Sequence, residues 1–186
     1  RDWDRFVVRH GILRLLLSAY TGLYPKEIGI KSDAKGKPFI EGGDHYAALQ
    51  FSMSHSAGMA VFAFGLSLEL GVDIERISGF PEMNELAAAN FTPAEVMELD
   101  CRPESVRVAN FYKLWTRKEA VLKACGDGLA IALNRVDVSK PAGEVGQWSV
   151  SRIEGDGLKR RFRFVDLAIA PGFAVAVAAD NGDQDL

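Results

Sequence analysis

The spacing of apolar residues divides the first part of the chain into one helix followed by strands. Residues 5–20 (RFVVRHGILRLLLSAY) have the periodicity of an amphipathic helix, which Thr21-Gly22 and Pro25 terminate. Short apolar or alternating runs between turn residues predict strands at residues 27–31, 48–51, 59–65 and 71–77. The polar segment SMSHSAG, residues 52–58, is predicted to be the loop between the second and third of these strands.

In the second part of the chain, helices precede strands. Residues 81–90 are predicted to be helical, and Thr92-Pro93-Ala94-Glu95 has a Thr N-cap, a Pro at the first helical position and a Glu three residues after the cap. The long helix that follows contains the amphipathic stretch FYKLWTRKEAVLKACGDGLA, residues 111–130. Strands are predicted at residues 148–153, 161–170 and 173–179, with turns at Gly155-Asp156-Gly157 and Pro171-Gly172.

This order of elements predicts an α+β fold made of two similar lobes, each with antiparallel strands packed on a long helix. We place the N-terminal lobe at residues 1–68 and the C-terminal lobe at residues 69–186. Only Arg1–Asp4 precede the first helix, without a cap or a strand, so we expect the N-terminal lobe to lack upstream residues.

Composition narrows the class of protein. At 186 residues and 48% hydrophobic, the chain is large enough to bury a core, and its net charge of −3 argues against nucleic acid as a partner. Its apolar runs are too short to span a bilayer, which argues against a membrane partner. The 2 cysteines (Cys101, Cys125) and 3 scattered histidines (His10, His45, His55) predict neither a disulfide framework nor a zinc site, so a reducing, cytoplasmic location fits best.

Two carboxylates alternate with apolar residues in GVDIERI, residues 71–77. Alternation places Val72 and Ile74 on one face of the strand and Asp73 and Glu75 on the other, about 6.5–7 Å apart. Like charges at this distance raise each other's pKa unless a cation lies between them, and Mg²⁺ is bound in this way by one or two carboxylates, water and phosphates. The alternative is an ordinary solvated strand face.

Three further motifs carry polar chemistry. Glu119 and Lys123 share one face of the long helix, either as an ordinary surface pair worth about 0.3–0.5 kcal/mol or as part of a site. The hydroxyls and histidine of residues 52–56 suit phosphate oxygens, whereas a Ser/His hydrolase is disfavoured because G-x-S-x-G is absent. Lys35-Gly36-Lys37-Pro38 presents two ammonium groups on a constrained loop, or is a solvated turn.

The joint order of these motifs decides between the alternatives. G-K-P at residues 36–38, S-H-S at 54–56, G-V-D-I-E at 71–75 and F-Y-x-L-W-T-x-K-E-A-x-x-K at 111–123 together resemble the Sfp-type 4′-phosphopantetheinyl transferases. The resemblance runs from Arg1 to the hairpin at residues 170–173. It implies a pseudo-two-fold α+β fold with coenzyme A bound between the lobes, and an active monomer that is a pseudo-dimer within one chain.

The resemblance also implies the reaction and the residues that perform it. The phosphopantetheine arm of coenzyme A would move to a serine of an acyl or peptidyl carrier protein, with release of adenosine 3′,5′-bisphosphate. Asp73, Glu75 and Glu119 would hold Mg²⁺, and Glu119 and Lys123 would be catalytic. The residues that the resemblance assigns to coenzyme A are Arg1, Lys37, Pro38, Ser54, His55 and Lys118.

One departure and two rival functions accompany this assignment. Ser52 stands where the family usually has Asn. The rivals are a non-catalytic module that holds coenzyme A or a carrier protein, and a generic Mg²⁺-dependent nucleotide phosphatase. Residues 80–107 are predicted to dock the carrier protein, through apolar and basic side chains that follow the metal ligands: Phe80, Met83, Leu86, Phe91, Met97, Leu99, Arg102 and Arg107.

Overall fold

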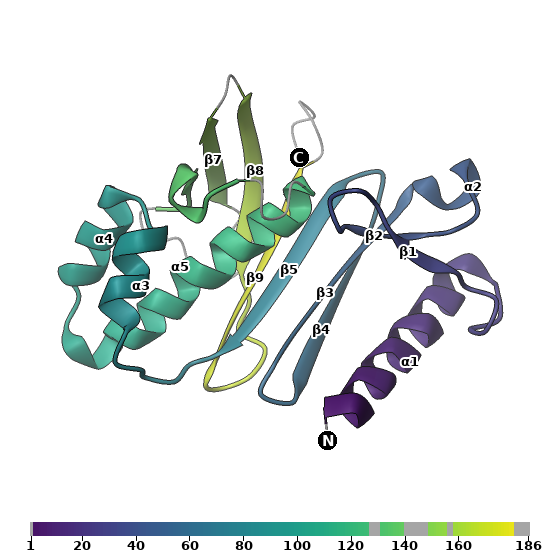
Figure 1. The fold of residues 1–186 in the computed structure, drawn as a ribbon, viewed down its shortest axis with the longest axis horizontal. Coiled ribbons are helices and arrows are strands. Elements are labelled where there is room, and N and C mark those ends of the chain that lie inside the picture. The colour runs from purple at the N-terminus through teal and green to yellow at the C-terminus, as the bar shows by residue number, and fades with distance from the viewer. Residues whose placement is uncertain (1, 127–130, 140–148, 156–157, 181–186) are drawn as a thin grey trace.

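The computed structural model describes residues 2–126, 131–139, 149–155 and 158–180 (Figure 1). The helices are α1 (Asp2–Thr21), α2 (Asp44–Ala47), α3 (Met83–Asn90), α4 (Pro93–Asp100), α5 (Glu104–Cys125) and the 3₁₀ helix η2 (Leu133–Arg135). The strands are β1 (Ile30–Ser32), β2 (Pro38–Ile40), β3 (Leu49–Ser56), β4 (Met59–Leu66), β5 (Glu69–Arg76), β6 (Val136–Asp137), β7 (Ser149–Gly155), β8 (Leu158–Asp166) and β9 (Phe173–Asp180).

Antiparallel pairing joins the described strands into two two-stranded sheets and one five-stranded sheet. β1 pairs with β2, β3 pairs with β4, and the remaining strands form a five-stranded sheet in the order β5-β9-β8-β7-β6. The hairpin β3–β4 lies beside β5, so that β3 and β5 bring the two parts of the molecule together (Figure 1). The α+β class with antiparallel sheets is therefore confirmed.

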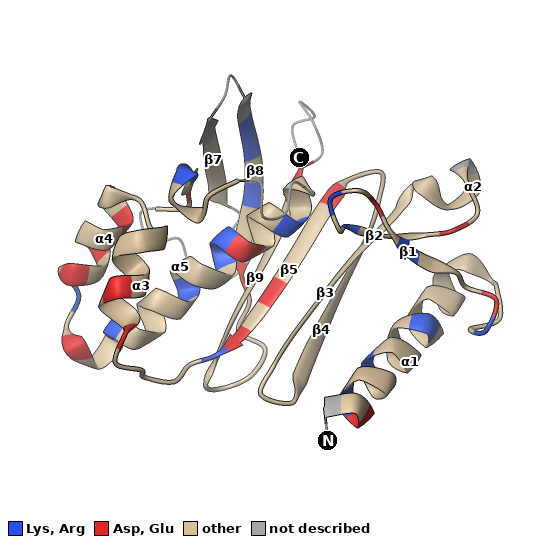
Figure 2. Cartoon of the chain, in the orientation of Figure 1, with Lys and Arg blue, Asp and Glu red and all other residues tan. Residues whose placement is uncertain are grey.

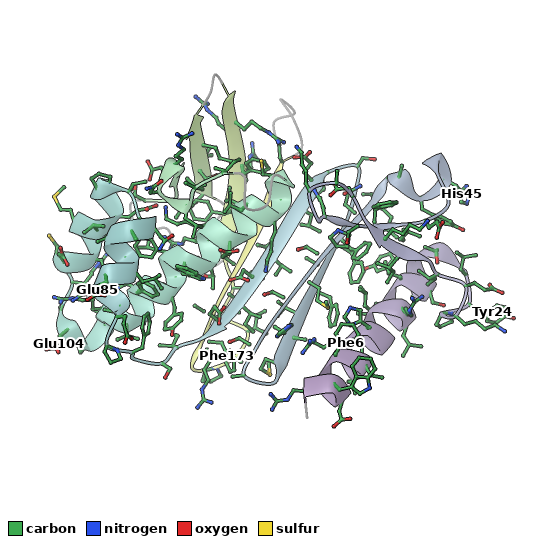
Figure 3. All side chains as sticks on the ribbon, in the orientation of Figure 1. Phe6, Tyr24, His45, Glu85, Glu104 and Phe173 are labelled. Carbon is green, nitrogen blue, oxygen red and sulfur yellow. The ribbon has the colours of Figure 1, made fainter. Side chains whose placement is uncertain are left out.

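Helix α1 confirms the helix predicted at residues 5–20. It packs on the first hairpins through Leu13 and Leu17, which share a core with Phe51 of β3. Phe6 lies on the side of α1 that faces the β3–β4 hairpin (Figure 3). No helix in the described ranges is both long and apolar enough to cross a membrane.

The loop predicted at residues 52–58 is wrong for its first five residues, which continue strand β3 to Ser56. Alternation explains this, because Ser52 and Ser54 are buried while His55 is exposed. The serine hydroxyls bond to β5, so polar side chains are accommodated inside the strand. The turn is confined to Ala57 and Gly58, both with positive φ.

The remaining strand predictions differ mainly at their ends. The strand predicted at residues 27–31 is β1, shifted to Ile30–Ser32, and its partner β2 was not predicted because three residues beginning with a proline carry little signal. The three C-terminal strands are confirmed as β7, β8 and β9. The predicted Trp148 start and the turn residues Asp156 and Gly157 lie outside the described residues.

Helix α5 forms the largest core with the five-stranded sheet. Its buried face includes Phe111, Leu114, Val121 and Leu122, which pack with residues of β8 and β9. The helix ends at Gly126, whose φ of 73° gives a left-handed C-cap, a conformation that glycine adopts readily. The predicted start of α4 is confirmed, with a complete Thr92–Glu95 capping box.

Candidate functional site

Strand β5 separates apolar from acidic side chains, as its alternation predicts. Val72 and Ile74 are buried in the cluster that joins the β3–β4 hairpin to the five-stranded sheet. Asp73 and Glu75 lie on the opposite face, toward α5, and Figure 2 shows these acidic positions along β5 next to charged residues of α5. Asp73 is only 4% exposed, so the alternative of a solvated strand face is wrong for this residue.

A glycine determines how closely α5 approaches these carboxylates. A Cβ atom at Gly71 would lie 2.0 Å from the carbonyl oxygen of Ala120 and 2.4 Å from the backbone nitrogen of Ala124. The backbones of β5 and α5 are therefore in direct contact at this point, which a larger residue does not permit. Glu119 precedes Ala120 and Lys123 precedes Ala124, so the contact brings both side chains to the acidic face of β5.

Lys123 connects α5 to β5 by direct hydrogen bonds. Its Nζ donates to Oδ1 of Asp73 at 2.7 Å and to the carbonyl oxygen of Val72 at 3.2 Å. The Ser54 hydroxyl donates to the same Oδ1 at 2.7 Å. The other oxygen of Asp73, Oδ2, is buried and has no hydrogen-bond partner within the described part of the chain. Lys123 and Ser54 thus converge on one carboxylate and leave its second oxygen available.

Burial and mutual repulsion act on the other two carboxylates. Burial, followed by the negative charge of Asp73 and that of Glu75, raises the pKa of Glu119, and Lys123 opposes this change. Burial also raises the pKa of Glu75, which the hydrogen bond from Ser56 opposes. Three carboxyl groups within electrostatic reach of one another, partly removed from water, are an arrangement that favours a proton or a cation among them.

The described residues do not by themselves form a closed metal site. Within residues 2–126, 131–139, 149–155 and 158–180, no three His, Cys, Asp or Glu side chains converge in an arrangement that could hold a metal ion. Lys123 instead provides the positive charge beside Asp73. The donor set nevertheless fits a hard divalent cation. The buried Oδ2 of Asp73 has no hydrogen-bond partner among the described residues, and carboxylate oxygens are the ligands that such a cation prefers.

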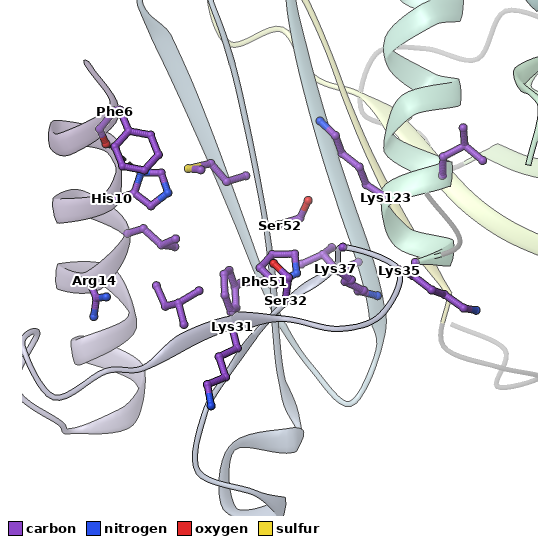
Figure 4. A pocket seen from close by; sticks show the side chains of 18 residues that line it. Phe6, His10, Arg14, Lys31, Ser32, Lys35, Lys37, Phe51, Ser52 and Lys123 are labelled. Carbon is purple, nitrogen blue, oxygen red and sulfur yellow. Dashed lines mark hydrogen bonds between the residues drawn. The ribbon is translucent and has the colours of Figure 1, made fainter. Parts of the chain in front are cut away.

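A cavity of about 650 Å³ lies beside this cluster, and Lys123 is part of its wall. Figure 4 shows Phe6, His10 and Arg14 reaching it from α1, and Phe51 and Ser52 from β3. Basic side chains of the β1–β2 segment complete it: Lys31, Lys35 and Lys37. The wall therefore combines apolar surface with clustered cations, which suits a ligand with both an organic body and phosphate groups.

Two of the predicted coenzyme A residues, Lys37 and Pro38, line this cavity. Lys37 also crosses to the other part of the molecule, where its Nζ donates to the carbonyl oxygen of Ala124 at 2.9 Å, at the C-terminus of α5. A cation there complements the negative end of the helix dipole. Burial lowers the pKa of Lys37, although the charges of Glu69 and Asp33 act in the opposite direction.

His55 faces a second, smaller cavity of about 390 Å³ between α1 and the β3–β4 hairpin. Arg5 and Arg9 share its wall, and sequence reasoning did not single them out. Their spacing of four residues in a predicted helix was the available signal, because it places them on one face. Burial, followed by the positive charges of Arg9 and Lys123, lowers the pKa of His55. An anion bound here would offset that repulsion.

The structure does not bring every predicted residue to these cavities. Lys118 is 0% exposed and pairs with Glu95 at 2.6 Å inside the core, where its Nζ also donates to the carbonyl oxygens of Leu133 and Val136. Its place is structural, because the side chain is fully enclosed and its donors are engaged. Arg1 lies outside the described residues.

Most apolar side chains of the predicted docking segment, residues 80–107, pack in or against the hydrophobic core. Met83, Phe91 and Leu99 are buried in the cluster beneath α5, so the prediction that they form a docking surface is wrong. They are needed to cover the sheet and the apolar face of α5. Met97, in contrast, is 64% exposed. Arg102 pairs with Glu98 at 3.2 Å on the surface of α4.

Comparison with known proteins adds independent information. The family model described as "4′-phosphopantetheinyl transferase superfamily" matches residues 69–178. The 4′-phosphopantetheinyl transferase HetI of Nostoc sp. is 36% identical over 68% of this chain and 53% of the relative. The 4′-phosphopantetheinyl transferase of Bacillus subtilis is 29% identical over 74% of this chain and 58% of the relative.

A human relative is similar over nearly the whole chain. The L-aminoadipate-semialdehyde dehydrogenase-phosphopantetheinyl transferase of Homo sapiens is 28% identical over 98% of this chain and 63% of the relative. The chain thus spans little more than half the length of the curated relatives that it matches.

Proposed function

The chain belongs to the 4′-phosphopantetheinyl transferase superfamily, and on this premise we propose that it transfers the phosphopantetheine arm of coenzyme A to a serine of an acyl or peptidyl carrier protein. Adenosine 3′,5′-bisphosphate is the second product. The observation that carries the proposal is the position of Lys123, which contacts Asp73 of the acidic cluster and at the same time lines the cationic cavity. Lys123 can thereby both neutralise negative charge in the acidic cluster and contact a phosphate group in the cavity.

The proposal includes two lobes related by a pseudo-two-fold axis, with a boundary between residues 68 and 69. Three observations support it. In each part a long helix packs on antiparallel strands, α1 on the first hairpins and α5 on the five-stranded sheet. The strands β3 and β5, one from each part, lie side by side at the centre (Figure 1). The larger cavity takes its wall from both parts.

Coenzyme A binds in this arrangement through the cations of the two cavities. Lys37 and Pro38 contact it in the larger cavity, and His55 contacts a phosphate group in the smaller one, where Arg5 and Arg9 add positive charge. Arg1 is retained as a predicted phosphate contact. Charge-assisted hydrogen bonds from such groups are about twice as strong as neutral ones. Ser54 acts differently from the prediction, because its hydroxyl is directed to Asp73.

Asp73, Glu75 and Glu119 are the residues that would hold Mg²⁺. Two observations support this assignment. The buried Oδ2 of Asp73 has no hydrogen-bond partner in the described part of the chain, and burial and neighbouring charge raise the pKa of both Glu75 and Glu119. When bound, the ion supplies neutralisation of the diphosphate charge.

Glu119 and Lys123 handle the proton and the charge of the transfer. The serine oxygen of the carrier bonds to the phosphorus that bears the pantetheine arm, and the bond from that phosphorus to the bridging diphosphate oxygen breaks. Glu119 accepts the hydroxyl proton on a carboxylate oxygen, directly or through water, and the raised pKa that its burial causes suits a base. The Lys123 ammonium stabilises the negative charge on the departing phosphate.

We further propose that the enzyme is a cytoplasmic monomer. All residues proposed for the site come from one chain, which supports an active monomer. Cys101 is exposed and Cys125 is buried, and 2 cysteines are too few for a disulfide framework, which supports a cytoplasmic location.

Mass spectrometry tests the proposed function. The protein is incubated with coenzyme A, Mg²⁺ and a panel of apo-carrier proteins, and the carriers are weighed for a phosphopantetheine addition. We expect addition to at least one carrier, with loss of the signal when a chelator removes Mg²⁺. Coenzyme A binding without addition to any carrier would favour the non-catalytic binding module instead.

A further inference from the structure

Three serines at alternate positions of β3 connect it to β5 through side chains. The hydroxyl oxygen of Ser52 accepts a hydrogen bond from the backbone N–H of Val72 at 3.1 Å, and that of Ser56 accepts one from the backbone N–H of Arg76 at 3.1 Å. In a continuous sheet these N–H groups would bond to carbonyl oxygens of the neighbouring strand. Here serine hydroxyls take the place of those acceptors.

Ser56 makes a second contact that Ser52 does not. Its hydroxyl donates to Oε2 of Glu75 at 2.7 Å while it accepts from Arg76. A hydroxyl has one proton and two lone pairs, so a bond from a fixed backbone N–H leaves the proton to be directed elsewhere. The side chain of Glu75 therefore receives a donor whose position is set by the backbone of its own strand.

The carboxylate of Glu75 has fewer side-chain hydrogen-bond donors than the carboxylate of Asp73 within the described part of the chain. Asp73 is held by both Ser54 and Lys123. Ser56 is the one side chain that hydrogen-bonds to the carboxylate of Glu75 within the described part of the chain. Because Glu75 is only half-buried and lies near the end of β5, a free rotamer would turn its carboxylate toward water.

We propose that Ser56 is a positioning residue, which fixes the carboxylate of Glu75 beside Asp73 and couples that position to the packing of β3 on β5. The inference rests on the proposed function, since it assigns Glu75 to the metal-binding carboxylates. Ser56 itself lines neither of the two cavities. It acts through Glu75, and through the backbone of Arg76 that anchors its hydroxyl.

Hydrogen exchange of the metal-free protein tests the contact itself, independently of activity. In Ser56→Ala the amide of Arg76 should exchange at least about tenfold faster than in the unmodified protein, whereas in Ser52→Ala the faster amide should be that of Val72. Ser56→Thr retains a hydroxyl and should keep Arg76 protected. Equal protection of Arg76 in the unmodified protein and in Ser56→Ala would overturn the proposal.

The metal dependence of transfer tests the consequence. Ser56→Ala should raise the Mg²⁺ concentration for half-maximal activity at least about fivefold and leave the KM for coenzyme A within about twofold, because only one metal-binding carboxylate loses its orientation. Ser56→Thr should restore most of the Mg²⁺ response. Ser151→Ala is the matched control, because Ser151 is a buried serine whose hydroxyl donates to the carbonyl oxygen of Phe162, far from the site along the sheet.

The outcomes separate this proposal from the proposed function. An unchanged Mg²⁺ response in Ser56→Ala, or a Ser56→Thr variant as impaired as Ser56→Ala, would overturn the positioning role while transfer by the unmodified protein stands. Absence of any Mg²⁺-dependent transfer by the unmodified protein would overturn the proposed function, and hydrogen exchange would still report on Ser56. If Ser56→Ala does not fold, Ser56→Cys keeps the size of the side chain with a weaker donor and replaces it in both measurements.

Discussion

Lys118 and Glu119 are adjacent on α5 but enter different environments. Successive residues of a helix are about 100° apart around its axis, so one side chain enters the core and the next faces β5. Lys118 is enclosed with Glu95, and its ammonium lies 5.5 Å from the centre of the Phe91 ring. Glu119 lies near the carboxylates of β5, where burial raises its pKa. Within one short motif, one charge stabilises the fold and the next is available for chemistry.

Replacement of Glu119 by Gln should abolish most transfer without unfolding the protein. Gln has the same size but cannot accept the serine proton or bind a cation as a carboxylate does, so we expect kcat to fall by at least about 100-fold. Removal of one negative charge also relieves repulsion from Asp73 and Glu75, so thermal stability should be unchanged or higher. A carrier-loading assay and a melting curve check both parts. Normal turnover at ordinary Mg²⁺ would contradict the assignment.

Replacement of Lys118 by Ala should act on stability. It would leave the buried Glu95 carboxylate without its cation, and breaking such a pair costs about 3–5 kcal/mol. Urea denaturation measures the loss in the free energy of unfolding. Lys113→Ala, at an exposed position of the same helix, is the control and should change little. A Lys118→Ala protein as stable as the control would show that the buried pair does not hold α4 to α5.

At the level of elements, the contact between α5 and β5 builds the site. Gly71 allows the two backbones to touch, and the small Ala174 and Ala176 stand opposite Glu75 and Asp73 on β9. The face above β5 is therefore left to the side chains of α5. A helix held farther from the strand would withdraw Lys123 from Asp73.

Gly71→Ala should therefore impair both stability and transfer. The added methyl group overlaps backbone atoms that cannot rotate away, so α5 must shift, and overpacking of this kind costs about 1–3 kcal/mol or more. Denaturation and carrier loading are measured together. Gly79→Ala is the matched control, since the nearest atom to its added Cβ, in Val108, lies 4.0 Å away. Full activity in Gly71→Ala would show that the close backbone contact is not required.

At the scale of the whole molecule, the first part supplies basic residues to the proposed site and the second part supplies carboxylates. Lys37 and His55 come from the first part, and the carboxylates come from β5 and α5 of the second. Lys37 also bonds to the last turn of α5, so it contacts the second part directly. We therefore expect coenzyme A to bind only when both parts are packed together.

Lys37→Ala and His55→Ala should each weaken coenzyme A binding. Loss of one charged hydrogen bond to phosphate costs about 1.5–3 kcal/mol, roughly a 10- to 150-fold increase in Kd. Isothermal calorimetry with the metal-free protein measures this directly. Arg102→Ala removes a cation just after α4 and should leave the Kd unchanged, which excludes an effect of net charge alone. Unchanged affinity in both test variants would move the phosphate site elsewhere.

Local patterns in the sequence determined the elements and much of the acidic cluster. Alternation placed Asp73 and Glu75 on one face of β5, and capping residues predicted the start of α4, because both signals act between near neighbours in the chain. The family motifs supplied Glu119 and Lys123. The first two of these inferences depend on side-chain spacing within one element and the third depends on the order of motifs along the chain, both of which the sequence contains in full.

Only the tertiary structure decided which polar residues share a site. Ser52, Ser54 and Ser56 are accommodated within strand β3 because β5 offers partners for their hydroxyls, and no local pattern encodes these contacts between residues 19 or 20 positions apart. Lys118 is enclosed because Glu95 and two backbone carbonyl oxygens surround it. Arg5 and Arg9 likewise lie beside His55 only because folding packs α1 against β3. The free energy of a buried charge or hydroxyl depends on the partners that folding brings to it from distant parts of the chain.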